Sequence, residues 1–240
     1  MDFFSSEEIV ASLGDKAKMK GKLSFVRLCI LGIMAGFCIA LGYLAFIRIT
    51  GTAPTEWGSF NNFLGGALFP VGLIALTFVG GELATGNMMV MTLGVLQKKV
   101  RVGALCYNWL VVLLTNCLGG FLVAYLFGHI VGLTEGAFLD KTVAVAQAKI
   151  ADPPLVAFVS GIGCNIFVCL AVYLGALAKS YLGKMFGLWF PVMVFVVCGF
   201  QHVVANAFII PAAIFSQSTT ISWWDYLQKD RKSTRLNSSH

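Results

Sequence analysis

Uncharged, apolar runs alternate with short charged segments along the 240-residue chain. The runs that contain no Asp, Glu, Lys or Arg extend over residues 28–47, 57–81, 102–134, 153–178 and 185–224. A hydrocarbon core about 30 Å thick needs roughly 20 apolar residues to be crossed as an α-helix. Because every run is long enough, the pattern predicts an all-α polytopic membrane protein.

The composition and the placement of charge agree with this prediction. Hydrophobic residues make up 58% of the chain and charged residues 12%, about half of the share that is usual in globular proteins. These values exclude a soluble protein. The net charge is +6, but the basic residues gather at residues 16–27, 98–101 and 179–184. This alternation between successive spans predicts a cell-membrane protein with a cytoplasmic N-terminus and no nucleic-acid partner.

Residues 5–20 precede the first apolar run and have a pattern of their own. They begin with two serines and two acidic residues, and they end in lysines. Acidic residues suit the start of a helix and basic residues its end. The segment therefore predicts a short amphipathic helix on the cytoplasmic membrane surface.

Two of the apolar runs contain the same internal pattern. Residues 69–87 begin with Phe-Pro and end in G-G-E-L-A-T-G-N, and residues 190–206 begin with Phe-Pro and end in G-F-Q-H-V-V-A-N. Residues 32–36 and 161–165, in the spans before them, are also similar. The chain thus resembles two copies of one unit, a full helix followed by a helix that a polar loop breaks. Copies separated by an odd number of crossings are inverted, as in many transporters.

The first copy has a third helix that the second copy lacks. This helix is expected over about residues 103–131, with the small-residue packing stripe N-C-L-G-G at residues 116–120. Repeat logic therefore predicts that five of six transmembrane helices are present. Residues 230–240 resemble the translation of a common sequencing adapter. We expect a membrane domain over residues 1–229 that lacks its last helix, and a non-native tail at residues 230–240.

The two predicted breaks form the candidate site. Interrupted backbone is tolerated within a membrane where it is buried in protein or lines a polar cavity, and half-helix N-termini favour small anions. We expect Glu82 and Thr85 on the first break to meet Gln201 and His202 on the second. His202 is the one histidine deep in a span. It is interpreted as functional because an ionisable side chain is costly there.

Other polar residues near the breaks have simpler interpretations. Glu82 is either a proton carrier or a structural acceptor for loop amides, and the structural role is favoured. For Thr85, a position that faces the pore and one that does not are equally compatible with the sequence. Asn87 and Asn206 are expected to cap the half-helices. By composition alone, Lys149 is a solvated charge.

These segments resemble the formate/nitrite transporter family of pentameric anion channels. The resemblance covers about residues 5–229 and rests on G-x-E-L-x-T-G-N at residues 80–87 and G-F-x-H-x-x-A-N at residues 199–206. It implies an aquaporin-like inverted repeat of six helices, two of them broken. It also implies one pore in each protomer of a homo-pentamer in a bacterial cell membrane, with formate, nitrite or hydrosulfide and protons as partners.

The resemblance also implies roles for single residues. His202 would be the central pore histidine, Thr85 the hydroxyl on the mobile loop that breaks the second helix, and Lys149 the vestibule lysine that attracts anions. The apolar constrictions would be formed by Phe69, Leu73, Leu83 and Phe195, with Val168 as a further member. The loops and the pore would be supported by Glu82, Asn87, Asn165, Gln201 and Asn206.

A pore of this kind suits a weak acid. A bare anion is strongly disfavoured between apolar rings, whereas its neutral acid is disfavoured much less. We expect formate to gain a proton near the centre, from water or from His202, and to pass as the acid. Nitrite and hydrosulfide remain open as alternatives. Gln201 stands where some formate channels of the family have an acid, which predicts a difference in gating or selectivity.

Other classes of protein fit less well. A membrane enzyme needs clustered His, Asp or Glu ligands, or a nucleophile with a base, and one glutamate with one histidine is too few. We therefore expect no enzyme activity, no cofactor and no metal. A water or glycerol channel would carry Asn-Pro-Ala, which residues 87–89 and 206–208 do not match.

Overall fold

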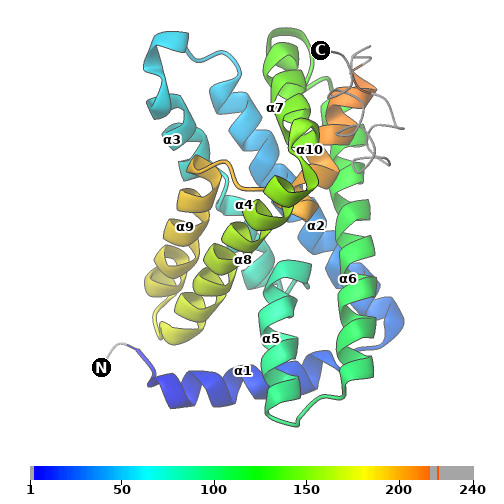
Figure 1. Ribbon diagram of the computed structural model, residues 1–240, viewed down its shortest axis with the longest axis vertical. Helices are drawn as coiled ribbons and strands as arrows, with labels where there is room; N and C mark the ends of the chain where they lie inside the picture. The colour runs from blue at the N-terminus through cyan, green and yellow to red at the C-terminus, as the bar shows by residue number, and fades with distance from the viewer. Residues whose placement is uncertain (1–2, 217–220, 222–240) are drawn as a thin grey trace.

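The computed structural model describes residues 3–216 and residue 221, and over this part of the chain the regular structure is helical (Figure 1). Four helical stretches of 18 residues or more have a mean hydropathy high enough to cross a membrane. They are Phe25–Thr50, Ser59–Val79, Val102–Ile130 and Pro154–Leu177. The predicted tail at residues 230–240 lies outside the described residues.

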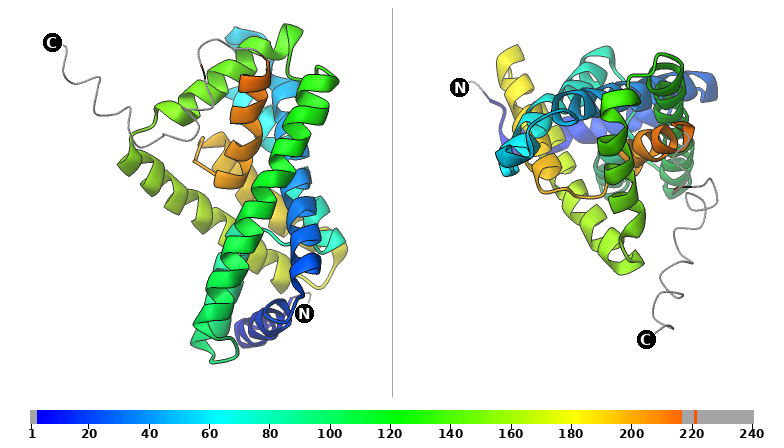
Figure 2. Two further views of the ribbon diagram at one scale, coloured as in Figure 1. Left: turned by 90° about the vertical axis from the view of Figure 1, so that its right-hand side faces the viewer. Right: turned by 90° about the horizontal axis from the view of Figure 1, so that it is seen from above.

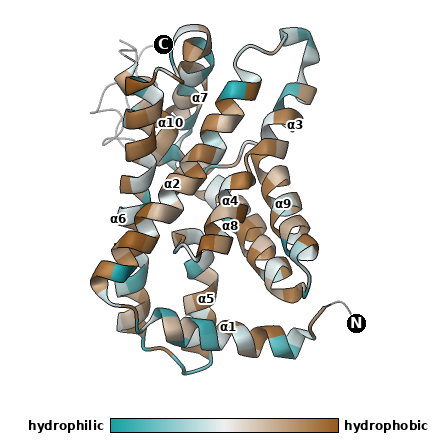
Figure 3. Cartoon of the chain, turned by 180° about the vertical axis from the view of Figure 1, so that it is seen from behind, coloured by the Kyte–Doolittle hydropathy of each residue, from teal (hydrophilic) through white to brown (hydrophobic). Residues whose placement is uncertain are grey.

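Helix α1 (Ser6–Lys20) lies across one end of the molecule, beneath the other helices in Figure 1. Ser5 caps its start, because the Ser5 hydroxyl accepts from the Glu8 amide while the Glu8 carboxylate accepts from the Ser5 amide. This reciprocal pair satisfies two donors that the helix itself leaves free. Ile9 and Leu13 lie on the face that packs against α5 (Ala84–Leu96). Figure 3 shows the polar bands along α1, and the helix expected over residues 5–20 is confirmed.

Helix α2 (Phe25–Thr50) runs through the middle of the bundle and packs against α6 (Val102–Val123) along much of its length. Gly36 and Gly119 allow this approach, since a Cβ on either residue would overlap the backbone of the other helix. The helix continues beyond α6 as a π-helical segment, Ala124–Ile130. The small residues expected to pack in this span therefore do so.

Two apolar segments are interrupted where the sequence repeat places the breaks. Helices α3 (Ser59–Leu68) and α4 (Val71–Val79) are followed, after a four-residue loop, by α5. In the same way α9 (Tyr181–Val197) is followed by α10 (Val203–Phe215). Gly80 and Gly199 adopt positive φ angles of 77° and 74° at the two breaks, a conformation that favours glycine. From the breaks, α5 and α10 extend in opposite directions (Figure 1).

The remaining elements close one end and one side of the bundle. Two short 3₁₀ turns, Thr55–Trp57 and Gly136–Phe138, lie in the connections. Helix α7 (Leu139–Ala151) packs against α10, and α8 (Pro154–Leu177) packs against α9. Helix α8 runs obliquely to α6 (Figure 2) and is sparsely covered, with 17% of its most apolar stretch buried compared with 56% for α2.

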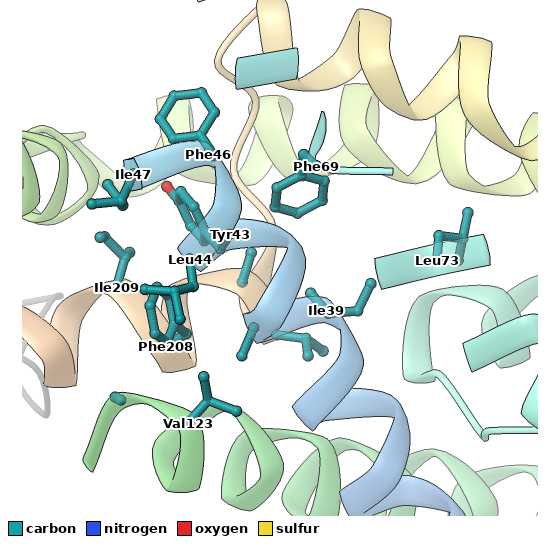
Figure 4. Close-up of a cluster of buried hydrophobic side chains, with 14 of the residues drawn as sticks. Ile39, Tyr43, Leu44, Phe46, Ile47, Phe69, Leu73, Val123, Phe208 and Ile209 are labelled. Carbon is teal, nitrogen blue, oxygen red and sulfur yellow. The ribbon is translucent and has the colours of Figure 1, made fainter. Parts of the chain in front are cut away.

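The main apolar core surrounds α2 and joins both halves of the chain. Tyr43 lies beside Phe69, with ring centroids 5.5 Å apart, and its ring also lies 5.8 Å from that of Phe208 (Figure 4). Phe69 belongs to the first interrupted segment and Phe208 to the second. Packing on α2 therefore joins the two interrupted segments.

Candidate functional site

The first break, residues 80–83, is held by side chains from three helices. Asn116 of α6 donates to the carbonyls of Gly32 and Glu82, each at 2.8 Å, and accepts from the amide of Ala84 at 2.9 Å. The Glu82 carboxylate accepts from Asn87 at 2.7 Å and forms an ion pair with Lys20 of α1 at 2.6 Å. The loop is thus fixed by hydrogen bonds along its backbone and by one ion pair at its acid.

The second break, residues 199–202, has the same outline with different partners. The Gln201 amide N–H donates to the hydroxyl of Ser160 at 2.8 Å, and the Gln201 side-chain carbonyl accepts from Asn206 at 2.7 Å. The side-chain amide of Gln201 donates to the carboxylate of Asp152 at 2.6 Å. Lys149 donates to the carbonyls of Gly199 and Phe200 at 2.8 and 3.1 Å.

Thr85 and His202 meet where the two half-helices begin. The Thr85 hydroxyl lies 3.4 Å from Nε2 of His202, and the two residues are 2% and 4% exposed. Thr85 is the second residue of α5 and His202 is the N-cap residue of α10, so the positive ends of the two helix dipoles converge here. Of the four residues expected to meet, Thr85 and His202 do so, whereas Glu82 and Gln201 bind other partners.

His202 has a second contact that decides which ring nitrogen carries a proton. It is the N-cap residue of α10, and its Nδ1 accepts from the amide N–H of Ala205 at 3.2 Å. A nitrogen that accepts a hydrogen bond holds no proton, so the neutral ring carries its proton on Nε2. Nε2 therefore donates to Thr85, which leaves the hydroxyl proton of Thr85 free to donate to another group.

Apolar residues enclose this polar pair on both sides. Phe195 stacks on the His202 ring with centroids 5.9 Å apart and an interplanar angle of 19°, and it meets Phe69 edge to face at 5.8 Å. The apolar residues predicted for the constrictions are all buried, with exposed fractions of 2–4%: Phe69, Leu73, Leu83, Val168 and Phe195. Of these, Val168 is the one that lines none of the cavities described next.

A vestibule lies on each side of the Thr85–His202 pair. The α1 vestibule is a cavity of about 550 Å³ whose lining includes Lys20, Glu82 and Leu83. The α7 vestibule, about 240 Å³, is lined by residues that include Lys149 and His202. Its lining also includes Phe69, Phe195 and Lys141. Burial lowers the pKa of Lys141. Each vestibule therefore combines apolar walls with at least one ammonium group.

A third cavity, about 280 Å³, opens beside the polar pair towards α8 and contains both Thr85 and His202 in its lining. Asn165 and Asn206 also line it, and neither side-chain carbonyl oxygen has a hydrogen-bond partner among the described residues. The Asn165 amide donates to the Gly161 carbonyl one turn earlier in α8. Asn165 thus lies near the pair, as expected, but contacts neither of its members.

Two expectations about these residues are wrong. Asn87 and Asn206 do not cap the half-helices, because the N-cap residues are Leu83 and His202. Each asparagine lies four residues beyond its N-cap and donates back to the side chain of the loop. Lys149 is also not a solvated charge, since the carbonyls of the second break hold its ammonium group.

Several residues that support the breaks were not predicted from the sequence. Lys20 and Asp152 contact the loop side chains, while Asn108 and Asn116 hold the first break from α6. A signal for the two asparagines was present, because amides eight residues apart lie about 80° apart around a helix and can share one broad face. No pattern in the sequence pairs Lys20 with Glu82, which are 62 residues apart.

Comparison with known proteins gives the family of this fold. The family model described as "Formate/nitrite transporter" matches residues 7–230. "Uncharacterized transporter YrhG" of Bacillus subtilis (strain 168) is 47% identical over 228 residues, which cover 95% of this chain and 85% of that protein. "Formate channel BtFdhC" of Bacillus thuringiensis is 43% identical over 225 residues, covering 94% and 86% of the two chains.

Solved structures agree with the sequence relatives. A chain described as "FNT family ion channel" superposes with a TM-score of 0.83 at 24% identity, covering 91% of this chain and 88% of that one. A "Pentameric formate channel with formate bound" superposes with a TM-score of 0.73 at 26% identity, covering 86% and 88%. The protein is accordingly a multi-pass membrane protein with the fold of these channels and not an enzyme. It belongs to the formate/nitrite transporter family.

Proposed function

We propose that this protein conducts formate and related small monovalent anions across the membrane, along a path from the α1 vestibule past Thr85 and His202 to the α7 vestibule. The observation that carries the proposal is the Thr85–His202 pair, which lies between two helix N-termini. "Formate channel BtFdhC", at 43% identity, and the solved channel with formate bound support formate as the substrate.

The charges in the two vestibules favour anions as cargo. Lys149 lines the α7 vestibule and Lys20 the α1 vestibule. A positive potential at a cavity mouth raises the local concentration of anions and their rate of arrival. Between the vestibules, the rings of Phe69 and Phe195 and the side chains of Leu73 and Leu83 form the apolar constrictions. We place Val168 in the packing behind them.

The proton that neutralises the anion comes from water in this proposal. His202 is neutral in the observed geometry, and its Nδ1 holds the cap of α10. To give up the Nε2 proton it would first need a proton on Nδ1, which would displace the Ala205 amide. Instead, Nε2 donates to Thr85, and the Thr85 hydroxyl donates to the substrate. The pair thus orients the weak acid, while protonation removes the large desolvation cost of the anion.

The relatives support a proposal for the assembly, and the charge pattern of the sequence supports one for the orientation. We propose that two inverted repeats build each protomer, with Glu82, Asn87, Gln201 and Asn206 fixing the two breaks and Asn165 lining the side of the pore. The chain assembles as a homo-pentamer with α1 on the cytoplasmic side of the cell membrane. The exposed apolar surface of α8 suits contact with lipid or with a neighbouring protomer. Residues 230–240 remain a proposed non-native tail.

The deciding experiment is formate flux into liposomes as a function of pH, for the unmodified protein and for His202→Asn. Asparagine is a good N-cap residue, so α10 should keep its start. We expect flux to fall while its pH dependence is retained. A pH dependence that disappears with His202 would make the histidine the proton donor. Absence of formate flux in the unmodified protein would overturn the function.

Substrate choice needs a parallel measurement. Formate, nitrite and hydrosulfide fluxes through the same preparation would rank the three anions, and we expect formate to be fastest. Thr85→Val is the matched variant, because valine has nearly the same shape and lacks the hydroxyl. If Thr85 orients the acid, the variant should lower formate flux strongly without changing the amount of folded protein.

A further inference from the structure

The α1 vestibule has more positive charge than one small anion requires. Its lining includes three lysines, Lys16 and Lys20 from α1 and Lys184 from α9, and one acidic residue, Glu82. Three positive groups and one negative group leave a net charge of +2. Lys20 is paired with Glu82, so the excess belongs to Lys16 and Lys184. Neither has an acidic partner within 4 Å among residues 3–216 and 221.

The two unpaired lysines affect each other across the cavity. Partial desolvation, followed by repulsion from the ammonium groups of Lys184 and Lys20, lowers the pKa of Lys16. Lys16 and Lys20 are four residues apart and therefore lie on one face of α1. Lys184 reaches the same cavity from the start of α9. The positive charge is thus concentrated in one space and contributed by two separate elements.

The volume also exceeds the needs of formate, which has three non-hydrogen atoms. The cavity of about 550 Å³ falls in the range of pockets that hold ligands of drug-like or cofactor size, roughly 300–1,000 Å³. The hydroxyl of Ser12 provides a further polar group in the lining. Ammonium groups bind phosphate oxygens as point charges. Charge, volume and lining together suit an anion with several negative charges.

We propose that the α1 vestibule is a regulatory site for a multivalent phosphate-bearing anion, held by Lys16 and Lys184, which blocks the path to Thr85. Leu83 lines the same cavity, two residues before Thr85. An anion bound between the two lysines therefore occupies the mouth through which formate must pass. The phosphate belongs either to a free anion or to the headgroup of an acidic lipid at the end of α1.

Calorimetry with the purified protein in detergent tests the site directly. Inorganic pyrophosphate is the probe, at constant ionic strength set by chloride. We expect binding, and a loss of about tenfold in affinity for Lys16→Gln and for Lys184→Gln, the factor that one hydrogen bond to a charged group contributes. Lys18→Gln is the matched control, because Lys18 lies on the same helix and does not line the cavity. No binding, or equal binding by all variants, overturns the site.

Flux measurements test the blocking step and distinguish the two sources. In zwitterionic liposomes with pyrophosphate on both sides, formate flux should fall, and the fall should be smaller for Lys16→Gln and Lys184→Gln. Anionic liposomes without pyrophosphate should leave flux unchanged if the ligand is a free anion. Inhibition there that the same variants relieve would identify a lipid headgroup. Binding without inhibition in either arm overturns the regulatory role.

The inhibition test rests on the proposed transport function, but the binding test does not. Calorimetry requires folded protein and no transport, so pyrophosphate binding with no formate flux would count against the proposed function alone. Formate flux with no pyrophosphate binding would count against the regulatory site alone.

Discussion

The two breaks share one geometry and differ in charge. At the first break an acid, Glu82, pairs with Lys20 and accepts from Asn87. At the second break a neutral amide, Gln201, accepts from Asn206 in the same way. The hydrogen bond from the asparagine is 2.7 Å long in both. The asparagine bond is therefore independent of whether the loop residue is charged.

The second loop has no acidic residue of its own, but a carboxylate lies next to it. Asp152, at the end of α7, accepts from the side-chain amide of Gln201 at 2.6 Å. Lys149 contacts the carbonyls of the loop rather than its side chain. At the first break, acid and lysine form an ion pair. At the second break, the side-chain amide of Gln201 accepts from Asn206 and donates to Asp152, which lies at the end of α7.

The two breaks also differ in which side chains hold their backbones. Asn116 makes three hydrogen bonds around the first break and is fully buried. Asn165 of α8, which lines the cavity beside the second break, makes one hydrogen bond to its own helix. Its carbonyl oxygen is unpartnered within the described part of the chain. The backbone of the second break is held instead by Lys149, which donates to the carbonyls of Gly199 and Phe200, and by Ser160, whose hydroxyl accepts from the Gln201 amide.

The largest effect is expected from removing these two asparagines in turn. Asn116→Ala removes the side-chain partner of the buried Glu82 carbonyl and of the buried Ala84 amide, which should cost about 3 kcal/mol in the free energy of unfolding. Asn165→Ala removes one hydrogen bond and should cost about 1 kcal/mol. Denaturant unfolding of both variants in detergent measures the difference. Equal losses would show that Asn116 stabilises the fold no more than Asn165 does.

A smaller effect is expected from Glu82→Gln, which makes the first loop neutral like the second. The ion pair is partly buried, with side-chain exposures of 20% for Lys20 and 7% for Glu82. Its loss should cost about 2 kcal/mol, between the values for exposed and buried pairs. Unfolding at low and at high salt measures this. An unchanged stability would mean that the Asn87 bond alone holds the loop.

The reverse exchange, Gln201→Glu, should cost about 1 kcal/mol at pH 8, because the new carboxylate would face that of Asp152. As the pH falls, one of the two carboxyls takes up a proton and restores the hydrogen bond. The folded state then binds that proton more tightly than the unfolded state, so the loss shrinks towards pH 5. Adding Asp152→Asn should remove the loss at pH 8. A deficit that persists in the double variant would assign it to packing instead.

The smallest effect is expected from the other ion pair of α1. Asp15 and Lys99 lie 2.8 Å apart, but their side chains are 68% and 31% exposed. Exposed pairs contribute little, so Asp15→Asn should leave the unfolding midpoint unchanged within error. A loss as large as that of Glu82→Gln would show that attachment of α1, rather than the first break, determines both effects.

Much of the fold could be predicted from the sequence, for reasons that are local. Uncharged apolar runs of about 20 residues or more are stable as helices that cross a membrane. Gly80 and Gly199 at matched positions mark the breaks. Ser5 followed by Glu8 predicts the start of α1. Thr85 and His202 were identified because a hydroxyl and a histidine are unusual after a break in an apolar span. In each case the residue and its near neighbours in the sequence are sufficient for the prediction.

The tertiary structure alone determined which residues form hydrogen bonds and ion pairs with each other. Which nitrogen of His202 carries the proton depends on Ala205, and the partner of Glu82 is a lysine on a helix 62 residues away in sequence. Hydrogen-bond partners are set by where packing brings side chains together, and packing joins α2, α6 and the two breaks from distant parts of the chain. The apolar pattern therefore determined the spans and the breaks. Close packing around α2 determined which partners the polar and charged groups of the breaks have.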